Sequence, residues 1–234
     1  MKEETTFSAA RSTARIFGVL AGLGGLTHGI GEVLQGNVKP DGLIINSWTE
    51  GPIATNMGGE PGMTVVPNLL ITGILTIIVS LVVIIWALFV RDRKGGKILL
   101  LLSVLMMLVG GGFGPPIIGI LAGAAGTGIG TPSSWWQERL SASSWRSLAG
   151  LWPWFFGTAA INGVFLVIGS VVLVYFFDLD NADLFTNSFF FSIPSVALTI
   201  WAGRGYDLQK MARNVTASPA PVPPLSQAPT GQVD

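Results

Sequence analysis

Long apolar stretches dominate the pattern of the chain. A helix needs about 20 apolar residues to cross a hydrocarbon core roughly 30 Å thick, and four stretches meet this requirement. They occupy residues 16–36, 66–90, 154–177 and 185–203, and the last has Pro194 near its centre. Charged residues, proline or glycine bound each of them. The pattern therefore predicts four membrane-spanning helices.

A fifth apolar region, residues 97–130, has 34 residues and is too long for one ordinary span. It contains Gly114, Pro115 and Pro116, and a proline pair inside a helix removes two donors and clashes with the preceding turn. We therefore expect a helix break there. The arms 97–113 and 117–131 would be about 26 and 22 Å long as helices. They form either two thin spans or a re-entrant hairpin, which needs protein or a wet cavity around it.

The distribution of basic residues favours this turn. If the fifth region crossed only once, seven of the 13 lysines and arginines would lie on one side and six on the other. If it turns back, twelve lie on one side and only Lys39 lies on the other. Short cytoplasmic loops of membrane proteins are rich in Lys and Arg. We therefore expect a multi-pass protein of the cell membrane, with about six membrane segments and both termini in the cytoplasm.

Composition supports this class and excludes others. Charged residues make up 11% of the chain, against about 25% in soluble domains, and 50% of its residues are hydrophobic. A formal net charge of zero argues against nucleic-acid binding, which needs concentrated positive charge. The absence of cysteine excludes disulfides and thiolate ligands. The fold class is therefore an all-α integral membrane protein, with the lipid bilayer as its partner.

Tryptophan and proline mark two further segments. Trp135, Trp136, Trp145 and Trp152 lie between Pro132 and Pro153, and tryptophan favours the headgroup level of a bilayer. We expect a short Trp-rich interfacial helix there, on the cytoplasmic face. Residues 214–234 are rich in Pro, Ser, Ala and Gln and predict a disordered cytoplasmic tail. Residues 1–213 then form a single transmembrane domain.

The first apolar stretch has one small and polar helical face. Glycines recur on it every three or four residues, at Gly18, Gly22, Gly25 and Gly29, and Glu32 continues the face. His28 lies one helical turn before Glu32, and Gln35 lies at the edge. Ionisable residues within a span usually face the bundle interior or water, and histidine has a reference pKa of about 6.5. The pair is interpreted either as a proton-accepting or cation-coordinating site or as a hydrogen-bonded helix contact.

Two other stretches carry polar residues at helical spacing. Asn68 and Thr72 begin such a face on the second stretch, and Thr158 and Asn162 share a face on the fourth. Such residues commonly form hydrogen bonds between helices. With His28 and Glu32 they are candidates for lining one polar pathway.

These residues favour a small-molecule or ion transporter or channel with a polar interior. A structural or assembly subunit is one alternative, with homo-oligomer contacts through the glycine-rich helix faces. A membrane-embedded enzyme or cofactor binder is another, but the chain has one histidine and no cysteine. An ordinary zinc site or a bis-histidine haem would need more ligands, and no GxSxG motif is present. We therefore expect no metal, no cofactor and no catalytic residue.

Overall fold

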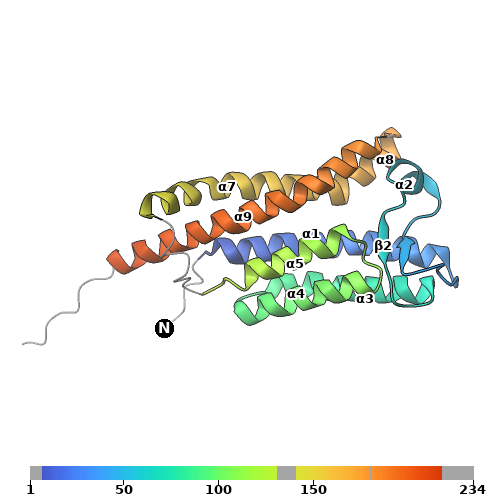
Figure 1. The fold of residues 1–234 in the computed structure, drawn as a ribbon, viewed down its shortest axis with the longest axis horizontal. Helices are drawn as coiled ribbons and strands as arrows, with labels where there is room; N and C mark the ends of the chain where they lie inside the picture. Colours follow the sequence, from blue (N-terminus) through green and yellow to red (C-terminus); the bar gives the residue numbers. More distant parts are fainter. Residues whose placement is uncertain (1–6, 131–140, 180, 218–234) are drawn as a thin grey trace, which may run out of the picture.

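The computed structural model describes residues 7–130, 141–179 and 181–217 and is mostly helical (Figure 1). Within these ranges the long elements are α1 (Ala9–Gln35), α3 (Leu69–Phe89), α4 (Arg93–Leu108), α5 (Gly114–Gly126), α7 (Ala142–Val164), α8 (Ser170–Phe177) and α9 (Ala182–Ala217). A π-helical turn, η1 (Phe165–Gly169), joins α7 to α8. The loop between α1 and α3 contains α2 (Gly51–Asn56) and the antiparallel strands β1 (Ile44–Asn46) and β2 (Pro61–Met63).

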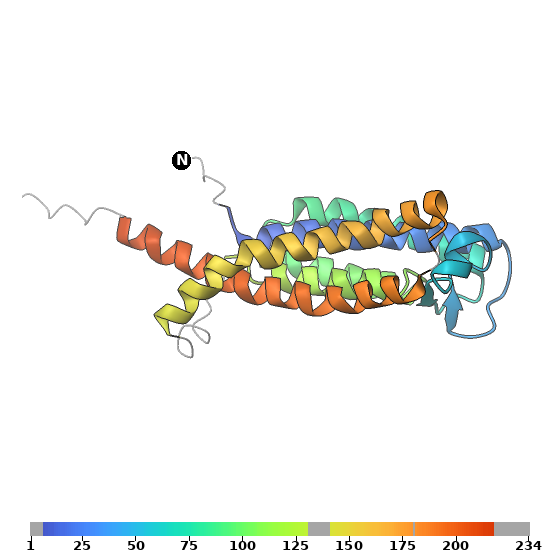
Figure 2. The same cartoon turned by 90° about the horizontal axis from the view of Figure 1, so that it is seen from above.

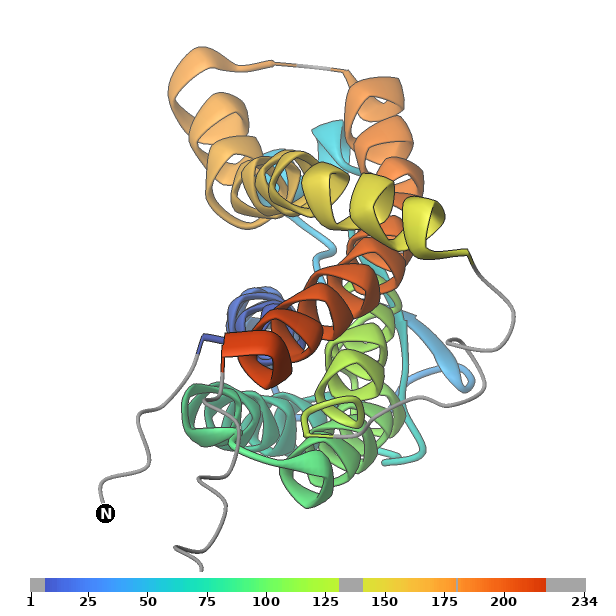
Figure 3. The same cartoon turned by 90° about the vertical axis from the view of Figure 1, so that its left-hand side faces the viewer.

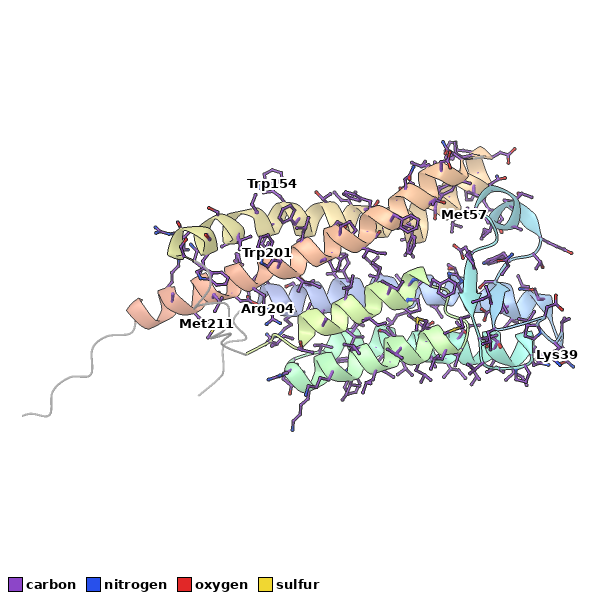
Figure 4. All side chains as sticks on the ribbon, in the orientation of Figure 1. Lys39, Met57, Trp154, Trp201, Arg204 and Met211 are labelled. Carbon is purple, nitrogen blue, oxygen red and sulfur yellow. The ribbon has the colours of Figure 1, made fainter. Side chains whose placement is uncertain are left out.

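Four helices in the described ranges are long and apolar enough to cross a membrane: Ala9–Gln35, Leu69–Phe89, Ser143–Phe177 and Ala182–Arg213. Large apolar side chains are exposed on their outer faces, among them Ile161, Phe176 and Trp154, which points away from the bundle (Figure 4). Soluble monomers rarely expose large continuous apolar surfaces. The structure is mostly helical apart from the two short strands, and its four apolar helices are compatible with the all-α membrane protein that the sequence predicts.

The helices are packed in two groups (Figures 2 and 3). In the first group, α1 packs against α3 and α5, and α5 packs against α4. The second group is α7 and η1 packed along α9, with α8 continuing from η1 and contacting α2, and α7 and α9 lie over α1 and α5. Glycines allow the close contacts, because an added Cβ at Gly29 would lie 3.0 Å from the Gly73 carbonyl oxygen. The glycine-rich face of α1 is thus covered within the chain, and the predicted homo-oligomer stays untested.

The first and last helices extend beyond the predicted stretches, because their polar ends bind each other. The Asp207 carboxylate accepts hydrogen bonds from the Ser8 hydroxyl and from the Ala9 and Ala10 amides, at 2.9, 2.7 and 3.0 Å. It therefore caps the N-terminus of α1 from another helix. Hydropathy alone does not detect this contact, and the helices run beyond the predicted membrane segments at residues 16 and 203. Residues 218–234, most of the predicted tail, lie outside the described ranges.

The fifth apolar region is a helical hairpin, but its turn lies earlier than predicted. The α4 helix ends at Leu108 and α5 begins at Gly114, so the break is at residues 109–113. Pro115 and Pro116 lie in the first turn of α5, where the backbone amides have no partner within the helix. The glycines before them make the turn, since Gly110 and Gly112 have φ of +111° and +75°.

The predicted interfacial helix is corrected in the same way. Residues 142–153 are the first turns of α7, which continues through Pro153 rather than starting after it. These turns run alongside α9, where small residues allow close contact. An added Cβ at Gly205 of α9 would lie 2.9 Å from Leu148 Cβ. Trp152 packs against Tyr206, with ring centroids 5.0 Å apart. Trp135 and Trp136 lie outside the described residues.

Positive charge gathers at one end of the bundle. The described lysines and arginines of this end are Arg11, Arg15, Arg91, Arg93, Lys94, Lys97, Arg146, Arg204, Lys210 and Arg213. Hydrogen bonds hold this end together, because Arg11 donates to the Arg91 carbonyl and Arg15 donates to the Val90 carbonyl, at 3.3 and 3.2 Å. Lys39 lies at the opposite end of the bundle (Figure 4). The remaining basic residues, Lys2 and Arg139, lie outside the described ranges.

Candidate functional site

His28 is buried where α1 meets the loop that carries the strands. The residue is 5% exposed, and its Nδ1 atom lies 2.8 Å from the Ser47 hydroxyl. Its Nε2 atom lies 3.6 Å from Oε2 of Glu60, just before β2. The ring packs on the backbone of the hairpin turn, since an added Cβ at Gly112 would lie 2.2 Å from it. The glycine run therefore serves to bring the turn onto the imidazole.

Glu32 is more completely buried than His28 and has no solvent exposure. Its Oε1 atom accepts from the Ser47 hydroxyl at 3.2 Å, and its Oε2 atom lies 3.2 Å from the Thr76 hydroxyl of α3. The turn covers it as well, because an added Cβ at Gly110 would lie 2.5 Å from Oε2. Within the described part of the chain, no lysine or arginine pairs with Glu32. Its polar environment consists of hydroxyls and backbone.

A cavity of about 380 Å³ lies between the two groups of helices. Its walls come from α1, α5, α7, η1 and α9, and they are mostly apolar, with Phe17, Phe113, Phe185, Phe189 and Phe190 among the lining residues. Ala159 and Gly163 of α7 also line it. The volume is within the range of small-molecule sites, about 300 to 1,000 Å³. Phe190 is 62% exposed, so the cavity reaches the molecular surface at α9.

The charged groups of the cavity lie at its loop end. His28 and Glu60 are the titratable residues among the described residues that line it, and Met57, which lies at the loop end of the bundle (Figure 4), lines it as well. Oε2 of Glu60 is buried and receives no hydrogen bond from the described residues. A buried carboxylate oxygen without a donor is costly. The cavity therefore presents an apolar body and a polar end that lacks a donor.

Of three further predicted residues, Gln35 supports the loop, Thr72 lies near the buried carboxyl and Asn68 does neither. Gln35 donates to the Asn46 and Ser47 carbonyls at 3.0 and 2.8 Å, which holds Ser47 against α1. Thr72 packs against Gly110, and its hydroxyl lies 3.0 Å from that of Thr64. Asn68 lies apart from this cluster and caps α3, because its Oδ1 accepts from the Ile71 amide at 3.1 Å.

The other predicted residues shape the helices around the cavity. Asn162 donates to the Ser188 carbonyl and the Ser192 hydroxyl, at 3.0 and 2.7 Å, and so joins α7 to α9. Gly114 and Pro115 line the cavity at the start of α5, and the buried Pro116 follows them. Pro194 lies inside α9, which continues through it.

Sequence reasoning did not select Ser47 or Glu60, although both contact His28. They lie in a loop whose local sequence predicts no role for them, and only the folding of the loop onto α1 brings them to the site. Thr76 had a weak signal, since it lies one helical turn after Thr72. Within the described ranges, no three side chains of the metal-ligating types gather as a metal site.

No family model, curated protein or solved structure matches the chain.

Proposed function

We propose that this protein is a membrane transporter for a small amphipathic molecule that binds in the cavity between the two helix groups. The observation that carries the proposal is the combination of apolar walls with a single charged end, formed by His28 and Glu60. Ionisable residues that face the interior of a membrane bundle commonly mark substrate pathways. An ion alone would leave the apolar walls unused, so an organic ligand fits better.

The head group of this ligand carries positive charge. Glu60 offers a carboxylate oxygen without a donor, and no lysine or arginine lines the cavity within the described residues. Phenylalanine rings also attract cations through their faces. The apolar body of the ligand lies along α7 and α9, where the exposed Phe190 lets it enter from the side.

The proposed topology has six crossings. The basic end of the bundle faces the cytoplasm, because short cytoplasmic loops are rich in Lys and Arg. The α4 helix starts at this end with Arg93 and reaches the opposite end, where Val109 pairs with Thr64 beside the strands. This favours two short spans over a shallow re-entrant hairpin. The site then lies near the outer surface of the cell membrane.

Binding to purified protein in lipid nanodiscs tests the proposal with matched variants on one helix. The probe is octyltrimethylammonium, measured against protein-free nanodiscs. Gly163 lines the cavity, so Gly163→Leu fills it, whereas Gly157 has no atom within 4 Å of an added Cβ and Gly157→Leu points into open space. We expect Gly163→Leu to weaken binding at least tenfold and Gly157→Leu to leave it unchanged. Equal binding by both variants would contradict the proposal.

Head-group preference is tested with the same alkyl chain. Octyltrimethylammonium should bind more tightly than octanol, and octanoate should bind least. Glu60→Gln should remove the preference for the cation, while Glu50→Gln, an exposed change in the same loop, should keep it. If octanoate binds as well as the cation, the assignment of a positively charged ligand is wrong.

A further inference from the structure

The hydroxyl of Thr76 fixes the direction of a buried hydrogen-bond chain. It hydrogen bonds to the Val109 carbonyl and also lies 3.2 Å from Oε2 of Glu32. A carbonyl oxygen can only accept, and a hydroxyl has one proton to donate. Thr76 therefore donates to Val109, and its contact with Glu32 needs a proton that the carboxyl supplies.

The same count sets the tautomer of His28. Ser47 donates its one hydroxyl proton to Oε1 of Glu32 at 3.2 Å. It has no second proton for His28, so the 2.8 Å contact between Ser47 and Nδ1 needs a proton on Nδ1. The chain then runs in one direction, from His28 through Ser47, Glu32 and Thr76 to the backbone carbonyl. In the neutral ring, Nε2 is left with a lone pair.

We propose that Glu32 is protonated and holds His28 in the Nδ1–H tautomer, so that Nε2 of His28 and Oε2 of Glu60 face each other as two acceptors. A proton between these atoms and the cationic head group of the ligand then exclude one another. These atoms are 3.6 Å apart at the end of the cavity. Two acceptors without a proton between them repel, so the site needs a positive charge or a donor. Either a proton on Nε2 or the ligand supplies it.

The exchange conserves charge. At a pH below the titration of His28, and with the cavity empty, Nε2 holds a proton and the imidazolium pairs with the Glu60 carboxylate. When the cationic ligand binds, that proton leaves Nε2 for water, and one positive charge replaces another. Within the described residues, the titratable groups near His28 are Glu32 on its own helix and Glu60 on the loop. The described residues of the hairpin turn and of α9 that line the cavity include no titratable side chain. Ligand binding should therefore strengthen as pH rises through the titration of His28.

The tautomer is directly measurable, because His28 is the only histidine in the chain. Protein with a non-histidine tag and ¹⁵N-labelled histidine gives NMR signals from this ring alone. At a pH where the ring is neutral, we expect a proton on Nδ1 and none on Nε2, and Ser47→Ala should relax this preference. A neutral ring with its proton on Nε2 in the unmodified protein would overturn the assignment.

The exclusion of proton and ligand rests on the proposed function and is tested separately. Calorimetry of octyltrimethylammonium binding in two buffers of different ionisation enthalpy counts the protons released. Where NMR shows His28 protonated, we expect about one proton released per ligand, and where it shows the ring neutral, none. Binding without proton release at the lower pH would overturn the exclusion. Absence of binding would contradict the proposed function, while the NMR result would still decide the tautomer.

Discussion

Replacing Glu32 tests the assigned proton through stability. If the carboxyl is neutral, glutamine reproduces it, because the amide group can donate to Thr76 and its carbonyl can accept from Ser47. Both hydrogen bonds persist, so we expect Glu32→Gln to change the free energy of unfolding by less than about 1 kcal/mol. Alanine removes both partners and one buried methylene, because Cβ is kept. An unpaired Ser47 hydroxyl costs about 1 to 3 kcal/mol and the methylene about 0.8 kcal/mol, which together give about 2 to 4 kcal/mol for Glu32→Ala.

The assay is SDS-induced unfolding of the purified variants in mixed micelles, followed by helix content. An ionised Glu32 gives a different result, because a buried charge without a cation costs several kcal/mol and removing it relieves that cost. Glu32→Gln would then stabilise the protein by more than about 2 kcal/mol. That gain, or a loss for Gln as large as that for Ala, would refute the reasoning.

Two further changes test the surroundings of the site. Gly112→Ala should destabilise the protein by about 2 kcal/mol more than Gly58→Ala. Both glycines have positive φ, but only at Gly112 does an added Cβ meet the His28 ring. Equal effects in the unfolding assay would contradict the close packing of the turn. Asp207→Ala should cost about 1 to 2 kcal/mol through loss of the cap on α1, whereas the exposed Asp183→Ala should cost little; hydrogen exchange at the first amides of α1 should rise only in the former.

The membrane-spanning stretches were predictable because a bilayer demands about 20 apolar residues whatever the tertiary structure. The predicted mostly helical fold and its four long apolar helices are confirmed. Helix ends were less predictable, since Asp207 caps the N-terminus of α1 through a contact between distant parts of the chain. The prolines misled the prediction of the turn, because a proline pair is equally suited to the first turn of a helix.

The candidate site was predictable only where it lies on one helix. The spacing of His28 and Glu32 placed them on one face, and both are buried. The hydrogen bonds that connect these two residues run through the Ser47 hydroxyl, which lies between them. Ser47 and Glu60 reach the site through the fold of a loop, which leaves no periodic signal in the sequence. The roles of these residues stay predictions.

Transport itself is the most direct test of the central claim. Proteoliposomes with an acidic interior and a neutral exterior are given external radiolabelled octyltrimethylammonium, whose permanent charge slows passive entry. Because proton and ligand compete for one site, the protein should accumulate the cation inside, and dissipating the pH gradient should abolish the accumulation. Gly157→Leu should behave like the unmodified protein, and Gly163→Leu should not accumulate the cation. Uptake no greater than in protein-free vesicles, or equal uptake by both variants, would contradict the account.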